Sequence, residues 1–383
     1  MTPRPMTPLK LGMVGGGEGA FIGAVHRIAS RIDGEFTLVA GALSSSPDRA
    51  RASGAALGLD PARVYADFTA MADAEAARDD GIDAVAIVTP NHVHLAPALA
   101  FLERGINVIC DKPLTGTLDE ARTLAAAAEA SDALFVLTHN YSGYAMVRQA
   151  RAMVAAGALG TVRVVNVEYP QGWLAAPVEA EGNQQAAWRT DPAKSGAGGA
   201  IGDIGTHALQ LATFVTGEAP VRIAADLTAF VPRRRLDDNA HVMLRYASGA
   251  KGLIWASQVA VGCENALRLR VFGDAGGLEW CQETPDVLMF TPHGEPTRRL
   301  TRGGPGTEAT AALGRIPAGH PEGYLEGFAN LYRDAARAIR ARKAGEPMPE
   351  DLLLPTVRDG LLGVTFVDAC VRSSAADAAW IDL

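Results

Sequence analysis

The chain has 383 residues, more than one hydrophobic core usually organises, so we expect two domains. Its net charge of −8, with acidic and basic residues interspersed, argues against nucleic-acid binding and favours a small-molecule partner. No apolar run approaches the roughly 20 residues of a membrane span, and residues 1–5 lack a signal-peptide core, so we expect a cytoplasmic protein without membrane contact. The four cysteines are far apart, which predicts neither a disulfide framework nor a zinc site.

The first third of the chain alternates short apolar runs with amphipathic segments, the pattern of βαβ units in a parallel sheet. We expect strands at 9–14, 36–43, 84–89, 107–110 and 134–138. We expect helices at 23–31, 46–57, 94–104 and 118–130. Residues 1–139 are therefore predicted to form a dinucleotide-binding Rossmann domain.

After residue 140 the alternation gives way to long runs with a period of two, which are typical of an antiparallel sheet. We expect strands at 162–169, 221–230, 241–246, 252–260 and 267–272, and helices at 323–344 and 354–373; the loosest segment is 297–319. Residues 140–383 are thus predicted to be an α+β substrate-binding and oligomerisation domain with a large open, mostly antiparallel sheet. An uncovered sheet face favours a homo-oligomer, either a dimer or a tetramer.

A glycine-rich turn follows the first strand directly, between residues 15 and 26. Backbone N–H groups and a helix N-terminus at such a turn favour a bound phosphate, which indicates a dinucleotide. Gly15 and Gly17 fit the first two glycines of the pattern, and the third position is Ala20 or Gly23. The predicted cofactor contacts here are Gly15, Gly17, Ala20, Phe21 and Ile22. The alternative is a flexible turn that binds nothing.

The acidic residue that would hold the adenosine ribose is missing after the second strand, where residues 43–51 stand. Ser44 and Arg49 are expected near the ribose, and without a carboxylate to repel a 2′-phosphate the cofactor is NAD or NADP. The alternative is an exposed helix start capped by Ser46.

Two further segments carry chemistry. Lys112 comes just past a short apolar run, and Asp203 and His207 lie four residues apart where a glycine-rich loop becomes an apolar helix. These three groups could converge on one substrate, with His207 as acid–base, Lys112 stabilising the reacting oxygen and Asp203 orienting Lys112 or a hydroxyl. The alternatives are a solvated lysine, a helix cap and a core histidine.

Residues at the ends of parallel strands are expected to meet the cofactor. They are Thr89, Pro90, Asn91 and His94 after one strand and Asp111 with Lys112 after the next. A metal site built on His92 and His94 is the weaker reading, and we expect no metal. Trp173, Trp188 and Arg189 fit a sugar pocket, since aromatic faces suit C–H groups and arginine donates to hydroxyls; the alternative is a loop anchored by indoles.

Four motifs in this order make the whole chain resemble the Gfo/Idh/MocA family, the glucose–fructose oxidoreductase and inositol dehydrogenase group. They are the glycine turn ending in Gly23-x-x-His26, residues 89–94, Asp111-Lys112-Pro113, and the Gly-Gly-x-x-x-Asp-x-Gly-x-His run at 198–207. The resemblance implies that Lys112 is catalytic, with Asp111 replacing the family's Glu, and that Asp203 and His207 complete the site. Gln210 stands where the family usually has an acidic residue. Asn140, Tyr141 and His320 lie in segments that resemble substrate-pocket elements.

The resemblance and the residue pattern together imply an NAD(P)-dependent dehydrogenase that oxidises a secondary hydroxyl of a sugar, glycoside or cyclitol. Three alternatives stay open: a redox-neutral hydrolase or lyase with tightly bound NAD, a non-catalytic nucleotide-binding sensor protein, and a metallohydrolase.

Overall fold

The computed structural model describes residues 7–383, apart from the side chain of Gln184. The chain forms two compact units, and each is built from two stretches of sequence. The first comprises the chain up to Asn140 together with Leu325–Leu361, and the second comprises Tyr141–Tyr324 together with Leu362–Leu383. The functional division into a cofactor-binding domain at 1–139 and a substrate-binding domain at 140–383 stays a prediction. Among residues 7–383, none of the helices combines the length and hydrophobicity that crossing a bilayer requires.

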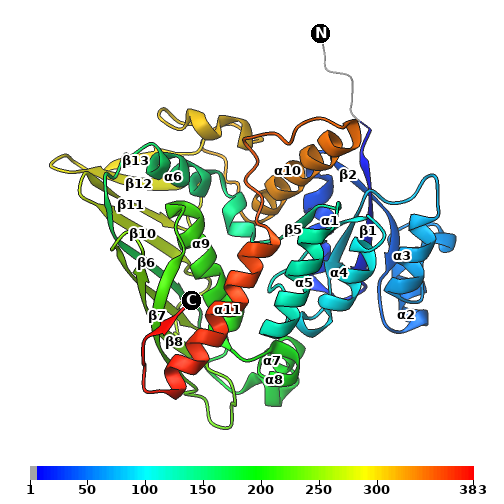
Figure 1. Cartoon of the computed structure of the whole chain (residues 1–383), viewed down its shortest axis with the longest axis horizontal. Helices are drawn as coiled ribbons and strands as arrows, with labels where there is room; N and C mark the ends of the chain where they lie inside the picture. The colour runs from blue at the N-terminus through cyan, green and yellow to red at the C-terminus, as the bar shows by residue number, and fades with distance from the viewer. Residues whose placement is uncertain (1–6) are drawn as a thin grey trace. The chain divides into compact units, whose positions relative to one another are not determined.

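A five-stranded parallel sheet forms the centre of the first unit (Figure 1). Its order is β2-β1-β3-β4-β5, and every neighbouring pair is parallel. The strands are β1 (Leu9–Gly15), β2 (Phe36–Ala42), β3 (Ala84–Val88), β4 (Asn107–Cys110) and β5 (Phe135–Leu137). The helices between them are α1 (Phe21–Ile32), α2 (Pro47–Ala56), α3 (Phe68–Ala76), α4 (Leu95–Leu102) and α5 (Leu118–Ala130). The predicted Rossmann fold is confirmed, although α3 was not expected.

The strand order changes direction at β1, because the chain first adds β2 on one side and then returns to add β3 on the other. Ligands of such sheets bind beyond the carboxyl ends of the strands at this point. Gly15 ends β1, whereas Thr89 and Asp111 directly follow β3 and β4. These predicted cofactor residues therefore lie at the carboxyl ends of the parallel strands.

Helix α10 (Tyr324–Ala344) belongs mainly to the first unit, although the long segment 141–324 precedes it. Arg340 pairs with Glu35, and Lys343 pairs with Asp83. The ring of Tyr332 packs edge-on against Phe36, with centroids 5.5 Å apart. The core of the first unit is thus completed by residues from the last fifth of the chain.

The second unit contains a nine-stranded sheet of order β13-β12-β11-β10-β6-β9-β8-β7-β14. All neighbours are antiparallel except β6 and β9, which are parallel. The strands are β6 (Val162–Pro170), β7 (Pro220–Thr228), β8 (Asn239–Tyr246), β9 (Lys251–Ser257), β10 (Arg268–Gly273), β11 (Gly276–Cys281), β12 (Val287–Pro292), β13 (Arg298–Thr301) and β14 (Ile381–Asp382). The predicted large, mostly antiparallel sheet is confirmed, and β11 to β14 extend it beyond the expected strands.

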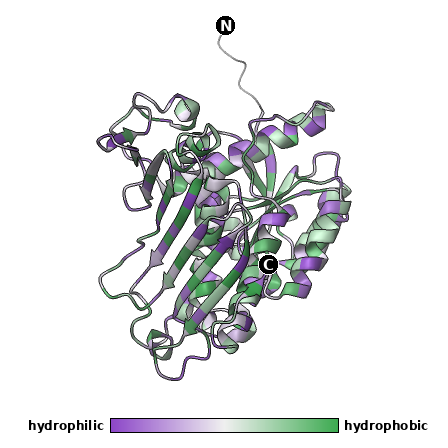
Figure 2. Cartoon of the chain, turned by 60° about the vertical axis from the view of Figure 1, so that its left-hand side comes forward, coloured by the Kyte–Doolittle hydropathy of each residue, from purple (hydrophilic) through white to green (hydrophobic). Residues whose placement is uncertain are grey.

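Helices cover one face of this sheet. Helices α6 (Ala145–Ala155) and α9 (Thr206–Thr216) pack against each other, and α9 also contacts β6. Short helices α7 (Gln184–Arg189) and α8 (Pro192–Ser195) precede α9, and α11 (Val357–Ala375) closes the chain before β14. Along the strands of this sheet, hydrophobic and hydrophilic residues alternate (Figure 2).

Candidate active site

The turn after β1 has the backbone shape of a phosphate cradle. Gly15, Gly16 and Gly19 have φ angles of +79°, +71° and +80°, which side chains rarely tolerate. A Cβ on Gly17 would lie 2.7 Å from the Leu43 carbonyl oxygen. At the start of α1, Ala20 supplies no side-chain cap, so no acidic or hydroxyl group of the cap competes with a bound anion. The turn therefore fits the pyrophosphate of a dinucleotide.

Gly23 brings α1 close to this turn. A Cβ at Gly23 would lie 2.4 Å from Cα of Gly16, so only glycine fits between the helix and the turn. Arg27, one helical turn later, donates a hydrogen bond to the Gly16 carbonyl oxygen. Of the two residues considered for the third glycine position, Gly23 makes the close packing, and the contact of Ala20 with cofactor stays a prediction.

We expect Gly23→Ala to weaken NADH binding by at least about tenfold, because the added methyl group displaces the Gly16 backbone from its cradle geometry. Titration of NADH fluorescence measures this. Gly116→Ala is the matched control, since its Cβ would meet neighbouring atoms only at 3.7 Å or more. Wild-type affinity in Gly23→Ala would contradict the assigned role of the turn.

His94 forms hydrogen bonds with the segments that follow two neighbouring strands, β3 and β4. Its Nδ1 lies 2.7 Å from the Pro113 carbonyl oxygen, and its Nε2 lies 2.9 Å from the Thr89 carbonyl oxygen. Burial lowers the pKa of His94, while Asp111 and the two carbonyl groups act in the opposite direction. His94 thus has a structural function, and its predicted contact with cofactor stays a prediction. Within residues 7–383, no three His, Cys, Asp or Glu side chains are grouped to hold a metal ion.

Asp111 and Lys112 follow β4 and are half-buried. Thr138, which follows β5, donates a hydrogen bond of 3.0 Å from Oγ1 to Oδ1 of Asp111. The same carboxylate oxygen lies 3.9 Å from Nε2 of His26. The lysine therefore stands next to a carboxylate whose orientation is fixed from two sides.

The segment after β2 is more exposed. The Ser44 hydroxyl accepts a hydrogen bond from the Ser46 backbone N–H, while Asp48 pairs with Arg51 on the surface of α2. Arg49 is exposed. Asp48 is the first acidic residue in the chain after β2, and its ion pair with Arg51 partly offsets its charge.

In the second unit, a π-helical turn, Ile201–Gly205, leads into α9 and carries Asp203. The Thr206 backbone N–H donates to the Ile201 carbonyl oxygen, five residues back, which widens the turn between Asp203 and His207. The expectation that both residues follow a glycine loop into a helix is confirmed, but the wide turn was not foreseen. Such turns occur frequently at functional sites.

Asp237 fixes the start of this turn. Its carboxylate accepts hydrogen bonds from the backbone N–H groups of Gly199 (2.7 Å) and Ile201 (2.8 Å), and its carbonyl oxygen accepts one from Ala200 (2.8 Å). A loop between β7 and β8 thus supplies the N-terminal cap that the glycine run lacks. Sequence reasoning missed Asp237 because it lies far along the chain from the helix that it caps.

Asp203 is held by two donors. Arg189 donates from Nε (3.1 Å) and Gln258 donates from Nε2 (2.9 Å) to its Oδ2. The Arg189 guanidinium group also lies over the ring of Trp188 at 4.1 Å and over that of Trp173 at 5.8 Å. The structure therefore brings the predicted residues Trp173, Trp188, Arg189 and Asp203 together.

His207 is buried beside two tyrosines. Its ring meets that of Tyr141 edge-on at 5.0 Å and lies 6.3 Å from that of Tyr169. The two phenol groups are hydrogen-bonded to each other, and Tyr169 also donates to Oδ1 of Asn265 at 2.8 Å. Burial raises the pKa of Tyr141, so this phenol keeps its proton and can act as a donor.

A hydrogen-bonded row of side chains continues from these tyrosines to the tryptophan. Gln171 donates to Asn265 (2.8 Å), and Trp173 donates from its indole to Gln171 (3.0 Å). Sequence reasoning missed Tyr169, Gln171, Gln258 and Asn265. The end of β6 and the end of β9 meet only because these strands pair in parallel, and nothing in the sequence shows that pairing.

The remaining predicted residues have separate surroundings. Asn140 is buried and is the last residue of the first of the two stretches that form the first unit. His320 is exposed, and its Nδ1 lies 3.3 Å from the Pro317 carbonyl oxygen of its own loop. Gln210 is buried one turn after His207. Contacts of these residues with substrate stay predictions.

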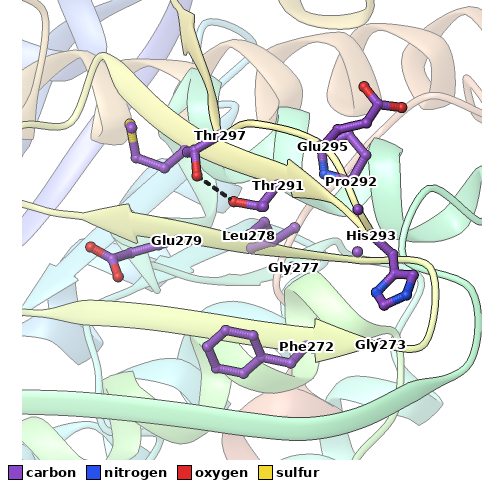
Figure 3. A pocket seen from close by; sticks show the side chains of 13 residues that line it. Phe272, Gly273, Gly277, Leu278, Glu279, Thr291, Pro292, His293, Glu295 and Thr297 are labelled. Atoms are coloured by element: carbon purple, nitrogen blue, oxygen red, sulfur yellow. Dashed lines mark hydrogen bonds between the residues drawn. The ribbon is translucent and has the colours of Figure 1, made fainter.

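A pocket of about 570 Å³ lies on the sheet of the second unit, lined by β10, β11, β12 and the loop at residues 293–297 (Figure 3). Phe272 and Glu279 line it, and the hydroxyl groups of Thr291 and Thr297 are 2.8 Å apart across the loop. None of the predicted site residues is among those that line it.

Comparison with known proteins identifies the family to which this fold belongs. Residues 9–139 match the oxidoreductase family with an NAD-binding Rossmann fold, and residues 147–279 match the GFO/IDH/MocA C-terminal domain. An oxidoreductase from Sinorhizobium meliloti has 56% sequence identity and a TM-score of 0.90, over 98% of this chain and 100% of that chain. The chain belongs to the GFO/IDH/MocA family of oxidoreductases. It is an NAD-binding enzyme of the dehydrogenase class. The sequence predicted this class and left the choice between NAD and NADP open.

Two other relatives have named ligands or substrates. An inositol dehydrogenase homologue from Azotobacter vinelandii, solved with NADH and myo-inositol, is 39% identical with a TM-score of 0.90 over 98% of both chains. The levoglucosan dehydrogenase of Pseudarthrobacter phenanthrenivorans is 29% identical over 99% of both chains.

Proposed function

We propose that this enzyme oxidises a secondary hydroxyl of a sugar, glycoside or cyclitol, with Lys112, Asp203 and His207 as its catalytic residues. The observation that carries the proposal is the setting of His207, a buried imidazole beside the phenols of Tyr141 and Tyr169 and four residues after Asp203. An imidazole nitrogen can accept and release a proton, which suits removal of a hydroxyl proton.

Each residue has a distinct role in this reaction. When bound, the nicotinamide accepts the hydride that leaves the carbinol carbon. His207 takes the hydroxyl proton. Loss of this proton from oxygen and of the hydride from carbon converts the alcohol to a carbonyl group. Lys112 stabilises the partial negative charge on the reacting oxygen. Asp203, held by Arg189 and Gln258, orients a neighbouring donor or substrate hydroxyl.

The proposed substrate class follows from the donors and acceptors around Asp203 and His207. Asn265, Gln171 and Gln258 present amide groups, and Trp173 and Trp188 present aromatic faces. A polyol ring offers both hydroxyl groups and C–H faces, which matches this combination. The inositol and levoglucosan dehydrogenases among the relatives support the same class.

A panel of sugars, glycosides and inositols, each with NAD and with NADP, tests the proposal through the absorbance of reduced nicotinamide. We expect NADH to accumulate in proportion to oxidised product. Product formation without accumulation of NADH would instead identify a redox-neutral hydrolase or lyase with tightly bound NAD. The ratio of the rates with NAD and with NADP shows whether residues 44–49 favour a ribose with a 2′-hydroxyl or one with a 2′-phosphate.

We also propose that the open sheet face pairs with a second copy of the chain. Met243, Leu253 and Phe272 are 46%, 52% and 42% exposed there, and Met243 and Leu253 lie opposite each other on β8 and β9. Ion pairs between Arg270 and Glu168 and between Arg268 and Glu279 lie among them. A face with both charge signs and apolar side chains can match itself across a two-fold axis.

Leu253→Glu is expected to convert an oligomer to monomers, because each copy would bury an unpaired carboxylate in the interface. Light scattering coupled to size-exclusion chromatography measures the mass. Val261→Glu is the control, since Val261 is 83% exposed and lies beyond the end of β9. A wild-type protein of monomeric mass would contradict the proposed pairing.

A further inference from the structure

A buried histidine in the first unit has no part in the chemistry described so far. His26 lies in α1 and is fully buried. Its Nδ1 is 2.8 Å from the hydroxyl oxygen of Tyr332, and the rings of Phe328 and Tyr332 lie 5.0 and 5.8 Å from its own. Helix α10 thus encloses this imidazole on one side.

On its other side, His26 faces the carboxylate beside Lys112. Nε2 of His26 is 3.9 Å from Oδ1 of Asp111 and makes no hydrogen bond within residues 7–383. This distance is too long for a direct hydrogen bond, and it places the imidazole within the electrostatic field of the half-buried carboxylate. A buried polar atom without a hydrogen bond costs stability, so its position needs an explanation.

The hydrogen bond with Tyr332 orients the His26 ring. Burial raises the pKa of Tyr332, so its phenol stays protonated and is able to donate to Nδ1. In the tautomer that accepts this bond, the imidazole carries its proton on Nε2, directed toward Asp111. Thr138 donates to the same carboxylate oxygen.

We propose that Tyr332 and His26 are positioning residues that hold the Asp111 carboxylate ionised and in a fixed orientation, and thereby place Lys112 for the reaction. The inference rests on the proposed catalytic role of Lys112. It assigns a role to α10, which reaches the first unit from the end of the chain.

The surroundings of Asp111 support an ionised carboxylate. Burial raises the pKa of Asp111, but His26, Lys112 and His94 together bring this pKa below its ordinary value. Burial lowers the pKa of His139 to about 4, so His139 adds no positive charge near neutral pH. The titratable groups that interact with Asp111 are His26, Lys112, His94, His139, Tyr332 and Cys110.

Steady-state kinetics of His26→Leu, His26→Gln and Tyr332→Phe test the proposal. We expect His26→Leu to lower kcat by about 10- to 100-fold with little change in substrate KM, as is typical when a supporting residue is lost. His26→Gln retains an N–H near the position of Nε2 and should recover most of that loss. Tyr332→Phe, which leaves the tautomer undefined, should fall between His26→Leu and the wild type.

The pH profile separates positioning from a purely structural role. Without His26, the pKa of Asp111 rises, so the acid-side fall in kcat should move to higher pH. Tyr65→Phe is the control, because Tyr65 also donates to a carboxylate in the first unit, that of Glu75, at 2.7 Å. It should lower the melting temperature without changing kcat or its pH dependence.

The outcomes distinguish this inference from the proposed function. If Lys112→Ala is inactive while His26→Leu has normal kcat and a normal pH profile, the positioning role is wrong and the proposed function stands. If Lys112→Ala is fully active, the catalytic role of Lys112 fails first. Equal losses in His26→Leu and Tyr65→Phe would reduce the effect to stability alone and would overturn the inference.

Discussion

Lys112→Ala and His207→Ala are each expected to lower kcat by at least about 100-fold, or about 2.7 kcal/mol of transition-state stabilisation. Lys112→Ala removes the positive charge beside the reacting oxygen, and His207→Ala removes the group that accepts the proton. The affinity for NADH should stay close to that of the wild type. Stopped-flow absorbance with the best substrate of the panel, together with NADH fluorescence titration, measures both quantities.

His293→Ala provides the control for these variants, because His293 is exposed in the loop after β12. Its kcat should equal that of the wild type. Near-normal rates in both Lys112→Ala and His207→Ala would refute the site. A loss in only one of them would leave that residue as catalytic and remove the other from the mechanism.

Gly199→Ala is expected to destabilise the protein by about 1–3 kcal/mol and to reduce kcat by at least about tenfold. Its Cβ would lie 2.0 Å from the Asp237 carbonyl oxygen, which already accepts a hydrogen bond from Ala200. The methyl group must push the loop at Asp237 away from the π-helical turn, and this shifts Asp203 and His207. Thermal unfolding and steady-state kinetics measure the two effects.

Gly202→Ala is the matched control in the same turn, because its Cβ would meet no atom within 4 Å. Its melting temperature should equal or slightly exceed that of the wild type, since alanine restricts the unfolded chain more than glycine does. A Gly199→Ala variant as stable and active as the wild type would mean that Asp237 does not hold the turn in place.

Much of the fold is readable from hydrophobic periodicity, and the exceptions have physical causes. Helix α6 was missed because Arg148 and Gln149 are buried in it, so its inward face carries polar residues and its amphipathic pattern is blurred. Helix α3 was missed for a similar reason, since its inward-facing Glu75 pairs with Arg63 inside the first unit. In each helix, the inward face carries polar residues that a hydrophobic pattern would place on the surface.

The residues of the candidate site also fall into those that sequence motifs predict and those that only the fold reveals. Lys112, Asp203 and His207 stand in short motifs, and their types and spacing suffice to nominate them. Asp237 and Gln258 come from a loop and a strand end whose partners lie elsewhere in the chain, so no local pattern nominates them. Supporting contacts of this kind become visible only when the strand pairing is known.

The return of α10 to the first unit limits how the gene can be divided. A fragment ending at Asn140 would lack Phe328 and Tyr332, exposing His26 and the apolar surface around Phe36 to water. Recombination that exchanges nucleotide preference between related enzymes would therefore have to transfer two separate segments together, the amino-terminal part and the segment 325–361.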